Sequence, residues 1–270
     1  MNKLREDAFK SPVYHIAIIV LLGIGLVFLP IEFLFEIIIQ DSYRAKVLGG
    51  IFLRVILSAF AVVAIRKYGF DKPFKSHGGF KAFIACLPAL VIAVNNFPFS
   101  ALLSGKISFH RDAIDVIFYI LYCLSVGVFE ELLFCGLVFP LVLFIFKHKR
   151  YSVVWAISIS SAIFALSHLM NLFSGASFGA TILQVGYSFL IGAMCSICKC
   201  VTRNIFTAMV LHGVYDIGGL LLSTFVGIGV GNQWDVFTVV LTLLLGVATT
   251  IYMIFLAIKI DLDEVEELYF

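Results

Sequence analysis

The sequence predicts an all-α fold, a polytopic helical bundle embedded in a membrane. Of the 270 residues, 61% are hydrophobic and only 13% are charged, whereas soluble domains carry about 25% charged residues. Mean hydropathy is +1.07, and apolar runs long enough to cross a bilayer recur along the chain. The net charge of +2 gives no indication of a nucleic-acid partner. The lipid bilayer is therefore the first partner that composition predicts.

About eight transmembrane helices account for the apolar runs. The predicted crossings are 13–29, 45–66, 80–98, 113–146, 151–170, 178–200, 205–225 and 234–259. The first run is too long for the core of a signal peptide and has no small-residue cleavage site after it, so it is expected to remain as a helix. Pro73, Gly78 and Gly79 mark a loop between the second and third crossings.

The basic residues indicate that residues 113–146 cross the membrane once. With one crossing there and a cytoplasmic N-terminus, most of the 19 Lys and Arg residues fall on cytoplasmic segments, including the KHKR loop at 147–150. The basic residues left in loops on the opposite side of the membrane are Arg44, Lys46, Lys106 and Arg111. Because basic residues in short loops mark the cytoplasmic face, we expect a multi-pass protein with both termini in the cytoplasm. The expected location is the cell membrane, in a bacterium the plasma membrane.

The chain divides into three predicted regions without internal repeats. Residues 1–112 form an N-terminal three-helix membrane region, and residues 113–225 form a helical core that carries the polar motifs. Residues 226–270 form the last transmembrane helix and an acidic cytoplasmic tail, IDLDEVEELYF from Ile260. A short acidic end of this kind is expected to be solvated.

Two adjacent glutamates, Glu130 and Glu131, lie in the apolar run SVGVFEELLFCG. Ionisable groups inside a membrane are costly, so they usually face a cavity and serve a function. The alternative is a structural acid that stays protonated and hydrogen-bonded. Adjacent residues on a helix point about 100° apart. One glutamate can therefore face a reaction site while the other faces a neighbouring helix.

Two further polar clusters lie inside predicted crossings. In FALSH, His168 follows Phe164 by one turn, and in HGVYD, His212 and Asp216 are four residues apart on one helix face. A lone histidine on an apolar face is more often a satisfied core residue. Several polar groups in a place without water need partners, however, and the least costly partners are each other.

Depth in the membrane tests this grouping. At 1.5 Å per residue, Glu130 lies about 24 Å and His168 about 26 Å from the cytoplasmic ends of their helices, whereas His212 lies only about 11 Å from its own. A helix over 113–146 would be about 51 Å long against a bilayer core of about 30 Å, so we expect it to protrude into the cytoplasm or to tilt. Protrusion by about three turns would bring the three groups level, nearer the cytoplasmic face.

The three motifs EELLFCG, FALSH and HGVYD, in this order on consecutive helices, resemble those of the CAAX protease and bacteriocin-processing family, also called the Abi family. The family pattern reads EExxxR, then FxxxH, then HxxxN or HxxxD. The resembling region runs from about 113 to 225. The resemblance implies an intramembrane endopeptidase that hydrolyses a peptide bond in a membrane-associated peptide or protein. Bacterial members are linked to bacteriocin immunity and to peptide maturation.

The resemblance also implies catalytic residues, namely Glu130, Glu131, His168, His212 and Asp216. Glu130 would act with His168 as the general base that activates a water molecule. His212 and Asp216 would donate or orient hydrogen bonds to the developing oxyanion. Asp216 stands where many members have asparagine, and an ionised aspartate cannot donate a hydrogen bond. It must therefore be protonated or orient His212 instead.

Cys135 is the clearest departure, because it replaces the arginine of the family pattern. That arginine would lie one turn from Glu131 and pair with it. Without a partner, a buried carboxylate costs several kcal/mol or takes up a proton. Arg54, which lies inside the second crossing, could reach Glu131 or could snorkel toward an interface. The departure keeps a second function open, a catalytically degenerate member that acts as a membrane scaffold or regulates a partner protein.

No cofactor is expected, with zinc as the alternative. The chain has no HExxH motif, although Glu130, His168 and His212 could supply a two-histidine, one-carboxylate set. The resemblance favours a metal-free glutamate mechanism. The thiols of CSICKC (195–200) lack a fourth ligand nearby, and disulfides are disfavoured at a cytoplasmic helix end, so these cysteines are expected to be inert.

A transporter that uses the acids as a proton relay is the third class considered. Transporters commonly show repeat symmetry or broken helices in both halves of the chain. Here the intramembrane acids and histidines all lie in the second half. The sequence therefore favours the endopeptidase.

Overall fold

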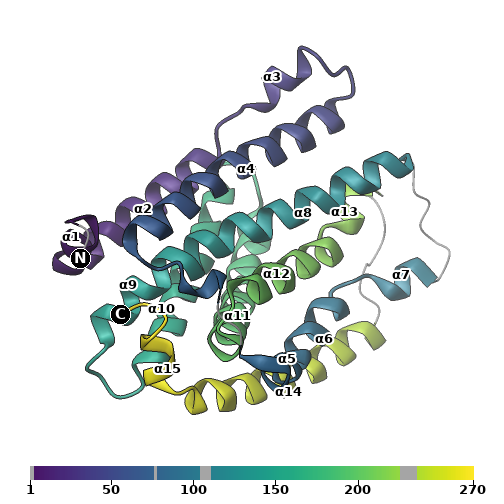
Figure 1. The fold of residues 1–270 in the computed structure, drawn as a ribbon. Coiled ribbons are helices and arrows are strands. Elements are labelled where there is room, and N and C mark those ends of the chain that lie inside the picture. The colour runs from purple at the N-terminus through teal and green to yellow at the C-terminus, as the bar shows by residue number, and fades with distance from the viewer. Residues whose placement is uncertain (1–2, 76–77, 104–110, 226–235) are drawn as a thin grey trace.

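The described part of the chain folds into helices. The computed structural model describes residues 3–75, 78–103, 111–225 and 236–270, and these ranges contain no β-strand (Figure 1). The α-helices are α1 (Lys3–Lys10), α2 (Pro12–Val27), α3 (Glu32–Glu36), α4 (Ser42–Tyr68), α5 (Gly79–Ala85), α6 (Leu87–Asn95), α7 (Phe99–Leu103), α8 (Ala113–Leu133), α9 (Phe139–Phe146), α10 (Ser152–Ser167), α11 (Phe178–Thr202), α12 (Ile205–Gly219), α13 (Leu221–Phe225), α14 (Val236–Lys259) and α15 (Leu262–Glu266). The tighter 3₁₀ segments are η1 (Lys72–Phe74) and η3 (His168–Leu172), and η2 (Phe134–Val138) is a π-helix.

Within the described ranges, 6 helical segments are long and apolar enough to cross a bilayer. They are Pro12–Glu36, Ser42–Tyr68, Ala113–Phe146, Ser152–Leu172, Phe178–Thr202 and Val236–Lys259. The all-α membrane bundle is thus confirmed, whereas the number eight is not. The predicted crossing 80–98 is broken at Cys86, because Pro88 lacks the N–H that would continue the helix. The predicted crossing 205–225 is broken at Leu220, directly after two glycines.

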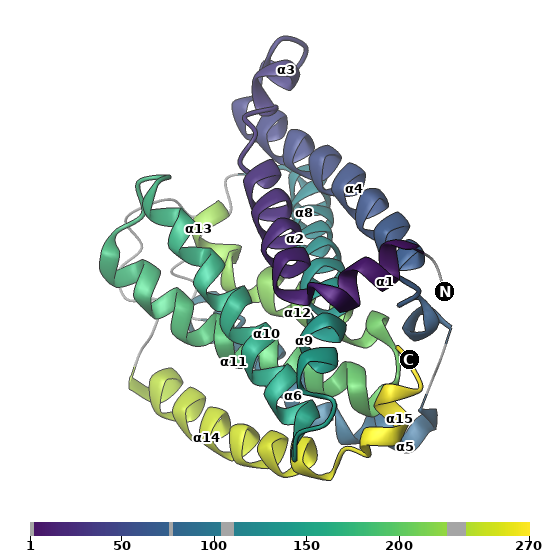
Figure 2. The ribbon, with the colours of Figure 1, turned by 90° about the vertical axis from the view of Figure 1, so that its left-hand side faces the viewer.

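The predicted single crossing at 113–146 forms one continuous helical element. Segments α8, η2 and α9 join into the 34-residue span Ala113–Phe146, the most buried of the candidate spans. Figure 2 shows α8 in the interior of the bundle, with α4 and α12 beside it. Helix α14 runs along the outside of the bundle and packs on α6 and α11. The division of the chain into three regions stays a prediction.

The π-helical segment η2 follows from Pro140. Proline has no backbone N–H, and its ring clashes with the carbonyl group one turn earlier. The N–H of Phe139 bonds instead to the carbonyl of Phe134, five residues back. π-Bulges inside α-helices occur frequently at functional sites. This one begins directly after the helix that carries Glu130 and Glu131.

Ion pairs join the start of α4 to the start of α8. Arg44 Nε lies 2.7 Å from Asp115 Oδ1, and an Arg111 nitrogen lies 3.1 Å from Asp41 Oδ2. Two of the basic residues predicted to lie outside the cytoplasm are therefore neutralised by acids. A third, Lys106, lies outside the described residues.

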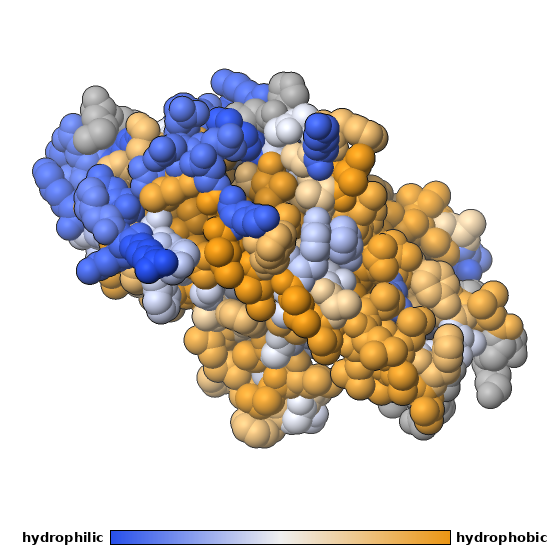
Figure 3. All heavy atoms as spheres, turned by 90° about the horizontal axis from the view of Figure 1, so that it is seen from below, coloured by the Kyte–Doolittle hydropathy of each residue, from blue (hydrophilic) through white to orange (hydrophobic). Residues whose placement is uncertain are grey.

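The two termini pack together at the other end of the bundle. Val265, Leu268 and Tyr269 are each 1% exposed, so the prediction of a solvated tail was wrong. Their spacing places three apolar side chains on one face, and that face is buried against the bundle. Polar side chains gather at this end, near α1 and α15, while apolar side chains cover most of the remaining face (Figure 3). Both termini share one end of the molecule, and their cytoplasmic location stays a prediction.

Gly127 sets the distance between α8 and α12. A Cβ atom here would lie 2.8 Å from the backbone nitrogen of Gly213 and 3.1 Å from the carbonyl oxygen of Met209. We expect Gly127→Ala to lower the free energy of unfolding by about 1–3 kcal/mol, the usual cost of overpacking. Gly186→Ala is the matched control, because its Cβ meets no atom within 4 Å and helix propensity favours alanine by up to about 1 kcal/mol. Equal thermal melts of the two variants in detergent would contradict this account.

Candidate active site

His212 lies at the centre of the candidate site, and acids from α8 and α12 surround it. Its Nδ1 atom is 2.7 Å from Glu131 Oε1. Its Nε2 atom is 3.4 Å from Glu130 Oε2 and 3.7 Å from Asp216 Oδ2. Both glutamates therefore face the same neighbouring helix. Because α12 packs against α8, one imidazole reaches both through its two nitrogens.

The three acids differ in their access to solvent. The Glu130 side chain is 21% exposed, against 16% for Asp216 and 4% for Glu131. Glu130 is therefore the carboxylate that an incoming water molecule or substrate reaches most easily. Glu131 is enclosed behind His212 and is placed to orient its ring.

His168 and His212 both contact the ring of Phe164. The ring centroid of Phe164 is 4.9 Å from that of His168 and 5.6 Å from that of His212, with edge-on geometry in both cases. His168 Nδ1 lies 3.1 Å from the carbonyl oxygen of Phe164. A carbonyl oxygen only accepts, so this bond places the hydrogen on Nδ1 and leaves Nε2 as an acceptor. Among the described residues, no hydrogen bond or ion pair joins His168 directly to Glu130.

Two anchors hold α12 in place. At its start, the side chain of Asn204 accepts a hydrogen bond of 2.8 Å from the N–H of Phe206, as an N-cap. At its end, the hydroxyl group of Tyr119 on α8 donates a 2.6 Å hydrogen bond to the carbonyl of Ile217. The second anchor lies next to Asp216, so α8 fixes both the glutamates and the end of the helix that faces them.

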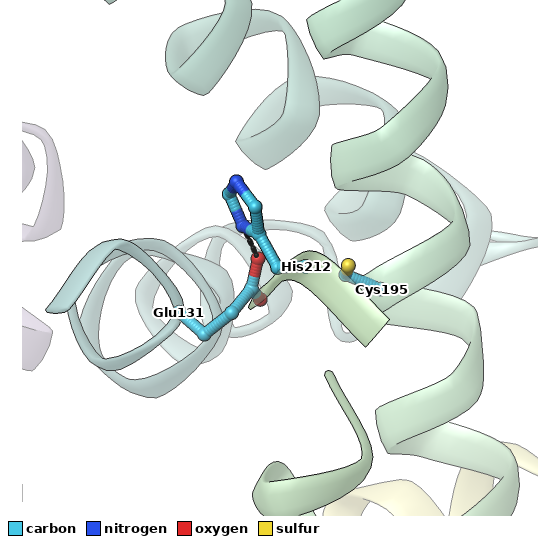
Figure 4. A group of neighbouring side chains, drawn as sticks. All are labelled: Glu131, Cys195 and His212. Carbon is cyan, nitrogen blue, oxygen red and sulfur yellow. Dashed lines mark hydrogen bonds and ion pairs between the residues drawn. The ribbon is translucent and has the colours of Figure 1, made fainter. Parts of the chain in front are cut away.

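Helix α11 adds polar groups that sequence reasoning did not assign to the site. Cys195 Sγ lies in one group with Glu131 and His212, all ligand-type atoms within 4.8 Å of one another (Figure 4). Ser196 Oγ is 3.3 Å from Cys135 Sγ. The cysteines are free thiols, as expected, but Cys195 forms part of the wall of the site. No spacing in the sequence indicates this, because it depends on how α11 crosses α8.

A small cavity of about 10 Å³ lies beside Glu131, close to the minimum size for one water molecule. It is lined by Glu131, Phe134, Cys135, Ser160, Ser161, Phe164, Gly192 and Ser196. Glu131 Oε2 and Ser161 Oγ are buried without a hydrogen-bond partner in the protein. The lining thus supplies polar atoms that are able to bind a small polar ligand.

Arg54 does not pair with Glu131. Its guanidinium group lies 4.7 Å from the centroid of the Tyr122 ring and donates a 3.2 Å hydrogen bond to the carbonyl of Gly50. The imidazole of His212 contacts Glu131 instead. Lys199 is a second cation inside the bundle. Its position in the sequence predicts a cytoplasmic helix end, but the side chain is fully buried near the end of α11.

Residues 112–218 match the family model described as type II CAAX prenyl endopeptidase Rce1-like. The matched region contains all three motifs and runs from the start of α8 almost to the end of α12. This region is similar to the Rce1-like CAAX endopeptidase family. No curated protein and no solved structure matches the chain. The candidate membrane spans and the similarity of residues 112–218 to a membrane endopeptidase family together support a multi-pass membrane protein.

Within the described residues, the Rce1-like region offers one group of side chains with metal-ligand spacing, Glu131, Cys195 and His212, all buried. Carboxylate, thiolate and imidazole groups are all zinc ligands. The set considered from sequence, Glu130 with His168 and His212, does not gather in this way. His168 lies against the Phe164 ring, outside the group formed by Glu131, Cys195 and His212.

Proposed function

We propose that this protein is an intramembrane endopeptidase that hydrolyses a peptide bond in a membrane-associated peptide or protein. The observation that carries the proposal is the meeting of Glu130, Glu131 and Asp216 at His212, inside a region of an endopeptidase family. The proposed setting is a bacterial plasma membrane with both termini in the cytoplasm. Bacteriocin immunity and peptide maturation are the roles that the family resemblance suggests.

In the proposed reaction, Glu130 and His168 form the general base. The carboxylate of Glu130 takes a proton from a water molecule, and the water oxygen attacks the carbonyl carbon of the peptide bond. The C–N bond then breaks as the leaving amine takes up a proton. The exposure of Glu130 and the free Nε2 acceptor of His168 support these roles. Positioned acid–base groups contribute about 10²–10⁴-fold to such reactions.

His212 and Asp216 are proposed to serve the oxyanion. The bond between His212 Nδ1 and Glu131 leaves Nε2 of the ring as the atom able to face the reaction centre. In the protonated ring Nε2 also carries a hydrogen, and this donor would stabilise the negative charge that develops in the transition state. Asp216 lies 3.7 Å from that nitrogen, which supports a role in orienting the ring rather than in donating to the oxyanion.

A non-catalytic role as a membrane scaffold is the second candidate. It is favoured by Cys135, which stands at the position of the family arginine and puts a neutral thiol, in contact with Ser196, where the family has a cation. Comparing membrane peptides from cells that produce the wild type or Glu130→Gln separates the two candidates. Peptides with new termini only in the wild type are expected. Identical peptides at equal protein levels would favour the scaffold.

Purified protein is expected to hold less than one zinc ion per chain and to keep its activity after chelation. The chain lacks an HExxH motif, and the predicted set of ligands does not gather. Elemental analysis before and after chelation, with activity measured in parallel, checks this. One tightly held zinc ion per chain, with activity lost on its removal, would reverse the expectation. Cys195→Ser would then show whether Glu131, Cys195 and His212 hold the ion.

A further inference from the structure

Lys199 is a buried cation that the proposed reaction does not use. It is 0% exposed, and no carboxylate in the described part of the chain forms an ion pair with it. Its Nζ atom lies 3.2 Å from the centroid of the Phe139 ring and 5.4 Å from that of Tyr269. An uncompensated buried charge costs several kcal/mol. Aromatic faces and carbonyl oxygens are therefore what stabilise this ammonium group.

The carbonyl group of Cys135 explains why the ammonium group lies there. In η2 the hydrogen bonds run five residues back, as from Phe139 to Phe134. The residue five positions after Cys135 is Pro140, which has no N–H to donate. Lys199 Nζ donates a 3.2 Å hydrogen bond to the Cys135 carbonyl. Lys199 thus replaces the backbone N–H donor that Pro140 lacks. The carbonyl that it satisfies, that of Cys135, lies one turn after Glu131.

The C-terminal residues close the other side of Lys199. Tyr269 is 1% exposed and packs its ring 6.0 Å from that of Phe139. Burial raises the pKa of Tyr269 to about 12, so the phenol is neutral at physiological pH and is not a counter-ion for the lysine. It excludes water from the ammonium group and offers an aromatic ring beside it.

Cations from separate parts of the chain hold this tail in its docked position. Arg5 of α1 donates a hydrogen bond to the carbonyl of Tyr269. Lys72 Nζ donates a 2.5 Å hydrogen bond to the carbonyl of Glu267, and Arg203 lies 3.3 Å from the Glu267 carboxylate. The ring of Phe270 also packs on two aromatic rings, with centroid distances of 5.6 Å to Phe9 and 5.8 Å to Phe144. The tail is thus fastened by backbone and side-chain contacts together.

We propose that Lys199 is a positioning residue, held by the docked C-terminal tail, which fixes the π-helical segment η2 and thereby the orientation of Glu131 toward His212. Contacts run in an unbroken series from Tyr269 through Lys199 to the Cys135 carbonyl. Cys135 and Glu131 line the same cavity. The effect on catalysis rests on the proposed function, whereas the coupling of the tail to η2 does not.

Hydrogen exchange measured by mass spectrometry tests the coupling in full-length protein in detergent. Lys199→Met and Tyr269→Leu should each speed exchange in peptides covering residues 131–140 by about tenfold, the scale of one lost hydrogen bond. Helix α14 should be unaffected. The double variant should exchange no faster than Lys199→Met alone, because both changes remove one series of contacts. Glu264→Gln, on the exposed face of α15, is the matched control and should behave as the wild type.

Three results would overturn the inference: unchanged exchange at 131–140 in Lys199→Met, additive effects in the double variant, or faster exchange in all helices alike. For a cleaved peptide, Lys199→Met should lower kcat and leave KM unchanged, because no substrate contact is removed. Because a loss of folded protein also lowers the apparent kcat without changing KM, kcat is calculated per folded protein, with the folded fraction measured separately for each variant. If the variants show the expected changes in exchange but the wild type cleaves no peptide, only the proposed function is overturned. A working peptidase whose residues 131–140 do not respond to Lys199→Met overturns only this inference.

Discussion

Glu130→Gln should reduce peptide hydrolysis by at least about 100-fold while the protein stays folded and inserted. Glutamine keeps the shape of the side chain but cannot take a proton from water, and general-base catalysis is worth about 10²–10⁴-fold. Glu130 is the most exposed of the three acids around His212, so the same change should cost little stability. The measurement is the rate of cleavage of a peptide identified by the membrane comparison, with purified variant at matched concentration.

Two further variants make this test specific. Glu36→Gln makes the same chemical change at an exposed position at the end of α3, and it should leave the rate unchanged. His168→Ala should also abolish hydrolysis if the two residues act together. Full activity in Glu130→Gln would remove the base assignment. Full activity in His168→Ala alone would remove His168 from the pair. This outcome is informative because, among the described residues, no hydrogen bond or ion pair joins His168 to Glu130.

Glu131→Leu should lower the free energy of unfolding by about 1–3 kcal/mol more than Glu131→Gln does, because leucine leaves the buried Nδ1–H donor of His212 without an acceptor. The Glu131 carboxylate lies 2.7 Å from His212 Nδ1, and both side chains are buried. Glu131→Gln should cost less than about 1.5 kcal/mol, because the amide oxygen still accepts from an Nδ1–H donor. At about 2–4 °C per kcal/mol for a chain of this size, thermal melts in detergent separate the two variants.

Arg54→Leu is the control for this second prediction. Since Arg54 contacts Tyr122 and Gly50 rather than Glu131, its removal should leave the cost of Glu131→Gln unchanged. A loss from Glu131→Gln as large as that from Glu131→Leu would show that the charge itself is required. The hydrogen-bonding account of the Glu131–His212 contact would then fail.

Local properties of the sequence are enough to predict the class of the protein and to mark the residues of the candidate site. The composition and the apolar runs specify a membrane helical bundle, because hydropathy and helical period are local properties of a chain. The single crossing at 113–146 followed from the positions of basic residues and is a continuous helix. The three motifs pointed to the endopeptidase family that residues 112–218 match. The π-helix at η2 also has a local cause, Pro140, and could have been expected from it.

Which of these groups are in contact depends on how the helices pack together. His212 rather than His168 contacts both glutamates, because Gly127 lets α12 approach α8 closely. The burial of Lys199 and of the acidic tail depends on segments more than sixty residues apart, as the Arg203–Glu267 pair shows with a separation of 64. Contacts between helices are set by crossing distance and angle, which depend on packing along both surfaces at once. The period of one helix specifies which face is apolar, but not which neighbour that face will meet.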